Sequence, residues 1–202
     1  MAMRTAYIGM GANLASRSGE PEATLAAALE RLASLGRVVR RSSLYSTVPV
    51  GYVKQPRFVN AVAALEATHA PFELLEELLE IERQFGRDRS RSFINGPRTL
   101  DLDILLVGGL VLHEAQLEVP HPRLAERAFV LVPLNEIAPE AVDPRHNKSV
   151  AQLLDALARE RKSEIDGVVR IESEIWRSAA AAGGAGPVRG SGEPDDHGGR
   201  PV

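Results

Sequence analysis

Hydrophobic positions along the chain follow two periods, and together they predict a mixed α/β protein. Period-two alternation over residues 5–11, 38–47, 58–66 and 99–107 predicts four strands. Apolar spacings of three and four over residues 21–36 and 71–86 predict two amphipathic helices, each with a proline in its first turn. The order β-α-β-β-α-β is that of a ferredoxin-like α+β sandwich with helices on one face of its sheet. Extra C-terminal elements follow, with helix expected over residues 125–137 and 150–161 and a strand over 168–171.

The second predicted helix carries one residue that does not fit its pattern. Its apolar stripe consists of Leu75, Leu78, Leu79 and Phe85. Glu82 lies four residues after Leu78 and seven after Leu75, so it shares the face of the stripe. Glu82 is therefore a polar misfit on the face that is expected to be buried.

Two carboxylates share one face of the strand predicted over residues 99–107. Asp101 and Asp103 point one way, whereas the leucines and the isoleucine of the strand point the other; these are Leu100, Leu102, Ile104 and Leu106. Residues two apart on a strand are roughly 6.5 Å apart. That spacing is too wide for a shared proton but suits a pair of divalent cations roughly 3.5–4 Å apart. The alternative is an ordinary solvated strand face.

An arginine-rich loop over residues 87–98 leads into this strand. Its arginines are Arg87, Arg89, Arg91 and Arg98, with only Asp88 to balance them. One guanidinium group can bind two phosphate oxygens at once, and it stabilises the charge that develops during phosphoryl transfer. The alternative is a solvated basic loop. Carboxylates for a metal beside arginines for phosphate predict a site for a Mg-nucleotide.

Two further groups of residues are candidates for ligand binding. His121, between two prolines, and Arg127 could reach a phosphate, although a lone histidine in such a place is commonly a loop residue. Phe58 could stack on a flat ligand and Asn60 could both donate and accept hydrogen bonds to it, beside the loop that begins at Thr47. The alternative for Phe58 is a place in the core.

Composition narrows the class of protein. The 202 residues suit one domain, expected over residues 1–176, and the Ala/Gly/Pro/Asp-rich residues 177–202 are predicted to be a disordered tail. A net charge of −3 argues against bulk nucleic-acid binding, and the absence of cysteine excludes disulfides and thiolate metal sites. Without a signal peptide or a long apolar run, a cytoplasmic protein without membrane segments is expected. A ferredoxin-like RNA-binding module is the rival interpretation, weakened by only one Trp, three Tyr and five Phe.

Six short motifs in order resemble a known family. They are Tyr-Ile-Gly-Met-Gly-Ala-Asn-Leu, Ser-Leu-Tyr-Ser-Thr-x-Pro-x-Gly, Gln-Pro-x-Phe-x-Asn-Ala, Ile-Glu-x-x-x-Gly-Arg-x-Arg, Gly-Pro-Arg-Thr-Leu-Asp-Leu-Asp-Ile, and Val-Pro-His-Pro-Arg with Glu-Arg-x-Phe. Over residues 5–150 the chain resembles 6-hydroxymethyl-7,8-dihydropterin pyrophosphokinase. The resemblance implies a ferredoxin-like fold and diphosphate transfer from ATP to a pterin alcohol in folate biosynthesis, giving AMP. It also implies two Mg²⁺ ions and substrates that are small molecules only. We expect a monomer.

The resemblance assigns roles to individual residues. Asp101 and Asp103 would hold the metal ions and, with Arg87 and Arg89, form the catalytic set. Contacts to ATP are implied for Glu82, Arg87, Arg89, Arg98, His121 and Arg127. A pterin pocket is implied for Thr47, Val48, Val50, Phe58, Asn60 and Phe129. The chain departs from the family pattern in three places: one extra residue in the loop leaves Arg91 unmatched, Asn95 replaces an aromatic for which Phe93 is the possible substitute, and Pro122 replaces another aromatic.

Overall fold

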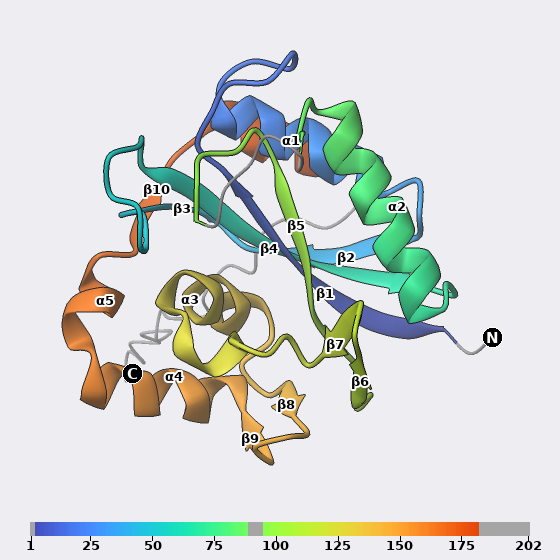
Figure 1. Cartoon of the computed structure of the whole chain (residues 1–202), viewed down its shortest axis with the longest axis vertical. Helices are drawn as coiled ribbons and strands as arrows, with labels where there is room; N and C mark the ends of the chain where they lie inside the picture. The colour runs from blue at the N-terminus through green and yellow to red at the C-terminus, as the bar shows by residue number, and fades with distance from the viewer. Residues whose placement is uncertain (1–2, 89–94, 182–202) are drawn as a thin grey trace, which may run out of the picture.

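The computed structural model describes residues 3–88 and 95–181, and an antiparallel sheet lies at its centre (Figure 1). The strand order is β10-β3-β4-β1-β5, and β2 pairs with β4 further along the edge that β3 occupies. Among the described residues, no helix is long and apolar enough to span a bilayer. The strands of this sheet are β1 (Arg4–Ala12), β2 (Arg37–Arg41), β3 (Leu44–Thr47), β4 (Phe58–Ala67), β5 (Asp101–Val107) and β10 (Val169–Ile171).

Helices cover both faces of this sheet (Figure 1). On one face lie α1 (Pro21–Leu32), α2 (Pro71–Gln84) and α6 (Glu174–Ala181). On the other lie α3 (Ala128–Ile137) and α4 (Val150–Glu160), continued by α5 (Lys162–Asp166). The predicted α/β class is confirmed, but the expectation of helices on one face holds only for α1 and α2. The remaining elements are the hairpin of β6 (Leu112–Glu114) and β7 (Leu117–Val119), the 3₁₀ helix η1 (Leu124–Glu126), and the hairpin of β8 (Val142–Asp143) and β9 (Lys148–Ser149).

The prediction of a single strand over residues 38–47 is wrong, because the structure has two strands there, β2 and β3. Ser42 lies at the break. Its hydroxyl accepts a hydrogen bond from the main-chain N–H of Val62 (2.9 Å), while its own N–H donates to the Val62 carbonyl (2.8 Å). The Ser42 hydroxyl thus replaces a main-chain carbonyl as the acceptor for Val62 of β4. The regular strand is interrupted at this point, between β2 and β3.

Strand β5 alternates as predicted only as far as Ile104. Its register against β1 shifts between Tyr7 and Ile8, which is a β-bulge. Leu105 and Leu106 consequently both pack in the core beneath α3 and α4, whereas Leu106 was expected on the same face as Ile104. The bulge lies beyond both aspartates, so their shared face at the start of the strand is preserved.

Helix α2 buries a stripe that is rotated from the predicted one. Its buried apolar residues are Leu74, Leu78 and Ile81, followed by the buried C-cap residue Phe85, and Leu75 is only half-buried. Glu82 also lies on this buried face, and its side chain is 1 % exposed. The prediction that Glu82 lies on the buried face is therefore confirmed, and the misfit identified in the sequence is a buried carboxylate.

Helix α6 attaches the C-terminal part of the described chain to the sheet. Trp176 is buried in the core with α1, and its indole N–H donates to the Ser42 carbonyl (2.9 Å). The buried Arg41 guanidinium lies 4.6 Å from the centre of the Trp176 ring and donates to the Trp176 carbonyl. Because α6 is continuous to Ala181, the expected tail boundary at residue 177 falls inside a helix. The rest of that tail, residues 182–202, lies outside the described residues.

Replacing Trp176 by alanine is expected to lower the free energy of unfolding by about 2–3 kcal/mol, below the ~3–5 kcal/mol of a wholly interior tryptophan, because α6 can detach. Urea unfolding followed by circular dichroism measures this change. Trp176→Phe is the control, since it keeps most of the buried area but loses the hydrogen bond to Ser42. A Trp176→Ala variant as stable as the wild type would show that α6 does not hold the fold.

Candidate active site

Most of the candidate residues line one cavity of about 260 Å³, at the end of the sheet where β5 begins. Its walls come from β1, β4, β5, the segment after β3 and the start of α3. Three other candidates, Arg89, Arg91 and Phe93, are not among the residues that the structure describes. The candidates that line the cavity are Thr47, Val48, Val50, Phe58, Asn60, Arg87, Arg98, Asp101, Asp103, His121, Arg127 and Phe129, together with Asn95.

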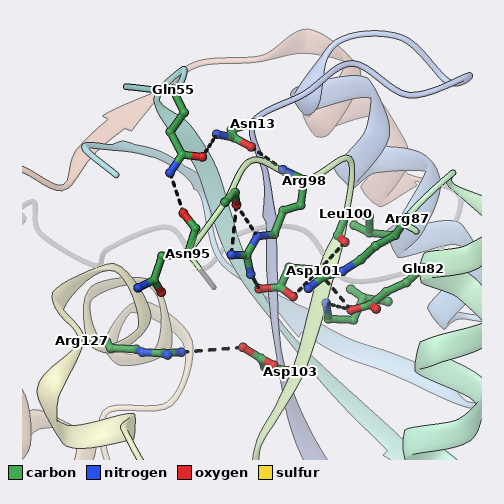
Figure 2. Close-up of polar contacts among 12 residues, drawn as sticks. Asn13, Gln55, Glu82, Arg87, Asn95, Arg98, Leu100, Asp101, Asp103 and Arg127 are labelled. Atoms are coloured by element: carbon green, nitrogen blue, oxygen red, sulfur yellow. Dashed lines mark hydrogen bonds and ion pairs between the residues drawn. The ribbon is translucent and has the colours of Figure 1, made fainter. Parts of the chain in front are cut away.

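Asp101 is held by two arginines (Figure 2). Arg87 donates to its Oδ1 and to the Leu100 carbonyl (2.8 Å), and Arg98 donates to its Oδ2 (2.8 Å). Burial raises the pKa of Asp101, but the two guanidinium groups outweigh it, and the net pKa lies below its usual value. Asp101 is therefore an ionised carboxylate. Each of its oxygens has a second lone pair, so both can accept from an arginine and still face a cation.

The negative charge of Asp103 is balanced by far less nearby positive charge than that of Asp101. Among the described residues Asp103 forms an ion pair only with Arg127, at 3.8 Å between Nη1 and Oδ2. Burial and the neighbouring Asp101 raise the pKa of Asp103 to about 6, against the opposing effect of Arg127. Asp101 and Asp103 lie on one face, and little positive charge is close to Asp103. This arrangement favours the binding of a cation that neutralises the two carboxylates.

Glu82 does not line the cavity, although the family resemblance placed it at ATP. Its Oε1 accepts a hydrogen bond from the main-chain N–H of Leu102 (2.8 Å) and lies 3.5 Å from Arg87 Nη1. Figure 2 shows it behind β5, on the side of α2. Since the side chain is 1 % exposed, a direct contact with nucleotide is not available to it in this structure. Glu82 instead fixes the main chain between the two aspartates.

The opposite wall of the cavity is suited to a flat, polar-edged ligand. Asn60 donates to the Thr47 hydroxyl (2.8 Å), which orients its amide, and a Cβ at Gly11 would lie 3.1 Å from Asn60 Oδ1. Phe58 is half-buried against the cavity rather than in the core, with Arg98 5.7 Å from its ring centre. Phe129 lines the cavity from α3. Aromatic faces with a fixed amide are typical of sites for heterocycles.

His121 lines the same cavity as Asp101 and Asp103, and hydrogen bonds fix both its main chain and its ring. Its N–H donates to the Leu105 carbonyl (2.9 Å), and its Nδ1 accepts from the Arg123 N–H (3.0 Å). An accepting Nδ1 places the ring proton on Nε2, which leaves Nε2 as a donor. Burial, together with the positive charges of Arg127 and Arg145, lowers the pKa of His121 to about 4. At neutral pH the imidazole is therefore a neutral hydrogen-bond donor.

Stability is expected to fall as the pH is lowered from about 6.5 toward 4, in part through His121. In that window His121 is protonated in the unfolded chain but neutral in the folded one, so the unfolded state binds more protons and is favoured. Arg127, Arg145 and Arg123 oppose protonation of the folded state, and Asp101 favours it. Urea unfolding at pH 7 and 4.5 should show a smaller loss for His121→Gln than for the wild type. Equal losses in the two proteins would contradict the assignment.

Two residues without an assigned role connect the loops of the site (Figure 2). The Asn13 amide donates to Gln55 Oε1 (2.9 Å) and to the Pro56 carbonyl (3.0 Å), while its oxygen accepts from the Arg98 N–H (2.8 Å). Gln55 in turn donates to the Asn95 carbonyl (2.7 Å). Both lie within the motifs of the family resemblance, which was the available signal, but their contacts join segments 40 or more residues apart in sequence.

An α/β fold whose cavity combines paired carboxylates, arginines and an aromatic pocket is suited to an enzyme that acts on phosphorylated substrates. A family model for 7,8-dihydro-6-hydroxymethylpterin-pyrophosphokinase matches residues 7–139, and the chain belongs to this family. A Pseudomonas aeruginosa relative, named 2-amino-4-hydroxy-6-hydroxymethyldihydropteridine pyrophosphokinase, is 46% identical over 144 residues, which are 69% of this chain and 85% of that protein. A Bacillus subtilis relative of the same name is 39% identical over 168 residues, which are 83% of this chain and 98% of that one.

Solved structures share the fold. The Plasmodium falciparum HPPK-DHPS structure with STZ-DHP matches with a TM-score of 0.66 at 15% identity. The match covers 85% of this chain and 47% of the Plasmodium chain, so this protein spans about half the length of that structural relative. At that identity the likeness concerns the fold alone. With the family established, the RNA-binding module is set aside, and the protein is a pyrophosphokinase.

Proposed function

We propose that the protein transfers the diphosphate group of ATP to the hydroxymethyl oxygen of 6-hydroxymethyl-7,8-dihydropterin, as a step of folate biosynthesis. The observation that carries this proposal is the meeting of two different walls in one cavity. Arg87, Arg98 and Asp103 belong to a wall suited to a metal-bound polyphosphate, and Phe58 and Asn60 to a wall suited to a pterin ring. Family membership supports the same reaction.

The transfer is a substitution at the β-phosphorus of ATP. The pterin oxygen forms a bond to that phosphorus and loses its proton to solvent, while the bond to the α,β-bridging oxygen breaks and its electron pair leaves with AMP. The protein contributes position and charge: Arg87, Arg98 and Arg127 face the phosphates, and His121 offers its Nε2 proton to a phosphate oxygen. Phe58 and Phe129 enclose the ring, and Asn60 reads its edge.

Asp101 and Asp103 are suited to hold magnesium, and two ions are proposed. Among the described residues, no group of three or more His, Cys, Asp or Glu forms a closed metal cage. Mg²⁺ in nucleotide sites is commonly held by one or two carboxylates, waters and phosphates, so two aspartates on an open wall fit it. When bound, the metal neutralises charge on the transferred phosphates.

The ferredoxin-like assignment and the remaining cellular expectations are also proposals. Strands β1, β2 with β3, β4 and β5, connected through α1 and α2, have the order of a split β-α-β-β-α-β unit. A monomeric state remains a prediction. A cytoplasmic location remains a prediction.

The direct test is AMP formation. Purified protein, Mg-ATP and the pterin alcohol should yield AMP and the pterin diphosphate in equal amounts, and omission of either the pterin or Mg²⁺ should stop the reaction. Formation of ADP and a pterin monophosphate would contradict the proposed transfer. Absence of any product from folded protein would indicate a family member without activity.

A further inference from the structure

The β8–β9 hairpin places one arginine against the main chain of the active site from outside. Arg145 does not line the cavity. Its Nη2 donates to the main-chain carbonyl of His121 at 2.7 Å, across 24 residues of sequence. The family model ends at residue 139, so this contact comes from a part of the chain beyond the matched region.

Arg145 is itself held in place by a buried carboxylate. The Asp143 side chain is fully buried, and its Oδ1 accepts from the Arg145 N–H (2.9 Å) and lies 3.7 Å from Arg145 Nε. Its Oδ2 lies 2.8 Å from His146 Nδ1. The buried carboxylate thus holds both the main chain and the guanidinium of Arg145 and is itself held by His146, so the position of the guanidinium is part of the folded hairpin.

The contact completes the support of His121. The His121 N–H is bound to Leu105 of β5, so Arg145 holds the same peptide segment from the carbonyl side. The ring is oriented separately, through the Arg123 N–H at Nδ1. Residue 121 is therefore fixed relative to the strand that carries Asp101 and Asp103.

We infer that Arg145 is a positioning residue for nucleotide binding: by anchoring the carbonyl of His121, it keeps Nε2 of the imidazole directed at the phosphates. The inference rests on the proposed function, since His121 is a phosphate contact only if ATP binds in this cavity. Arg145 touches no reacting atom, and its effect passes through His121.

Three variants test the inference. Arg145→Met removes the donor and keeps most of the side-chain volume, and Arg145→Lys restores a cationic donor. Arg40→Met is the matched control, because Arg40 also donates to a main-chain carbonyl, that of Ile137 (2.9 Å), away from the cavity. Arg145→Met should raise KM for Mg-ATP about tenfold, with KM for the pterin unchanged, which is the order expected for one hydrogen bond at a charged group. Arg145→Lys should recover most of the loss, and Arg40→Met should have wild-type constants.

A double-mutant cycle separates positioning from general stability. If Arg145 acts through His121, then Arg145→Met adds little to the KM of His121→Gln. Losses that multiply, a rise in both Michaelis constants, or the same rise in Arg40→Met would overturn the inference. Thermal unfolding of each variant shows whether the hairpin is folded under assay conditions.

An NMR titration of the His121 ring keeps this inference distinct from the proposed function. In the free protein, Arg145→Met should raise the pKa of His121 and alter its ring shifts, whereas Arg40→Met should change neither; the signal is assigned by its loss in His121→Gln. Wild-type protein that forms no AMP would contradict the proposed function. Unaltered His121 signals in Arg145→Met would contradict the positioning role whether or not AMP forms.

Discussion

Asp103→Asn is expected to abolish diphosphate transfer while making the metal-free protein more stable. Asp103 lies on the same strand face as Asp101, and among the described residues it pairs only with Arg127, at a long 3.8 Å. Asparagine keeps the shape of the side chain but removes the like charge. The free energy of unfolding without Mg²⁺ at pH 8 should rise by about 1 kcal/mol, a modest figure because the side chain is 37 % exposed.

The activity of the same variant should fall by roughly a thousandfold, because a lost metal ligand removes several kcal/mol of charge stabilisation. AMP release measures the activity, and urea unfolding with and without Mg²⁺ measures the stability. Glu66→Gln on β4 is the matched control, since it removes a strand carboxylate that pairs with an arginine, Arg37 (2.6 Å), outside the cavity. Asp103→Asn with wild-type activity would rule out Asp103 as a metal ligand.

Glu82→Leu is expected to destabilise the protein by about 3 kcal/mol, because it leaves a buried N–H and a buried guanidinium with less compensation. The Leu102 N–H loses its acceptor, and Arg87 loses a carboxylate 3.5 Å away. Activity should fall as well, since both contacts adjoin Asp101. Urea unfolding and AMP release measure the two effects.

Glu82→Gln distinguishes a structural Glu82 from one that binds nucleotide. Glutamine retains an oxygen that can accept from Leu102, so most of the stability and the KM for Mg-ATP should be preserved. Glu80→Leu on the exposed side of the same helix, where Glu80 pairs with Arg83 (2.6 Å), should leave both stability and activity nearly unchanged. A large rise in KM for Mg-ATP in a stable Glu82→Gln protein would restore the nucleotide contact that the family resemblance implied.

Local sequence patterns predict most of the elements and identify the candidate residues of the site. Alternation and helical spacing are local, so β4 and α4 lie close to where the pattern put them. The motifs that carry the aspartates and arginines are contiguous, and the structure brings the described members, Glu82 excepted, to one cavity. Local physics also identified Glu82 as a misfit, though not the reason for it.

The way in which these pieces support one another depends on contacts between distant parts of the chain. The bulge in β5 depends on its register with β1, the burial of Glu82 depends on Leu102 in another element, and the anchoring of His121 depends on Arg145 in a later hairpin. Helix α6 is held by Arg41 and Ser42, more than 130 residues earlier. Periodicity records which face of an element is apolar, but it carries no information about which distant donor meets a buried carboxylate or carbonyl. Those partners are chosen by packing in three dimensions.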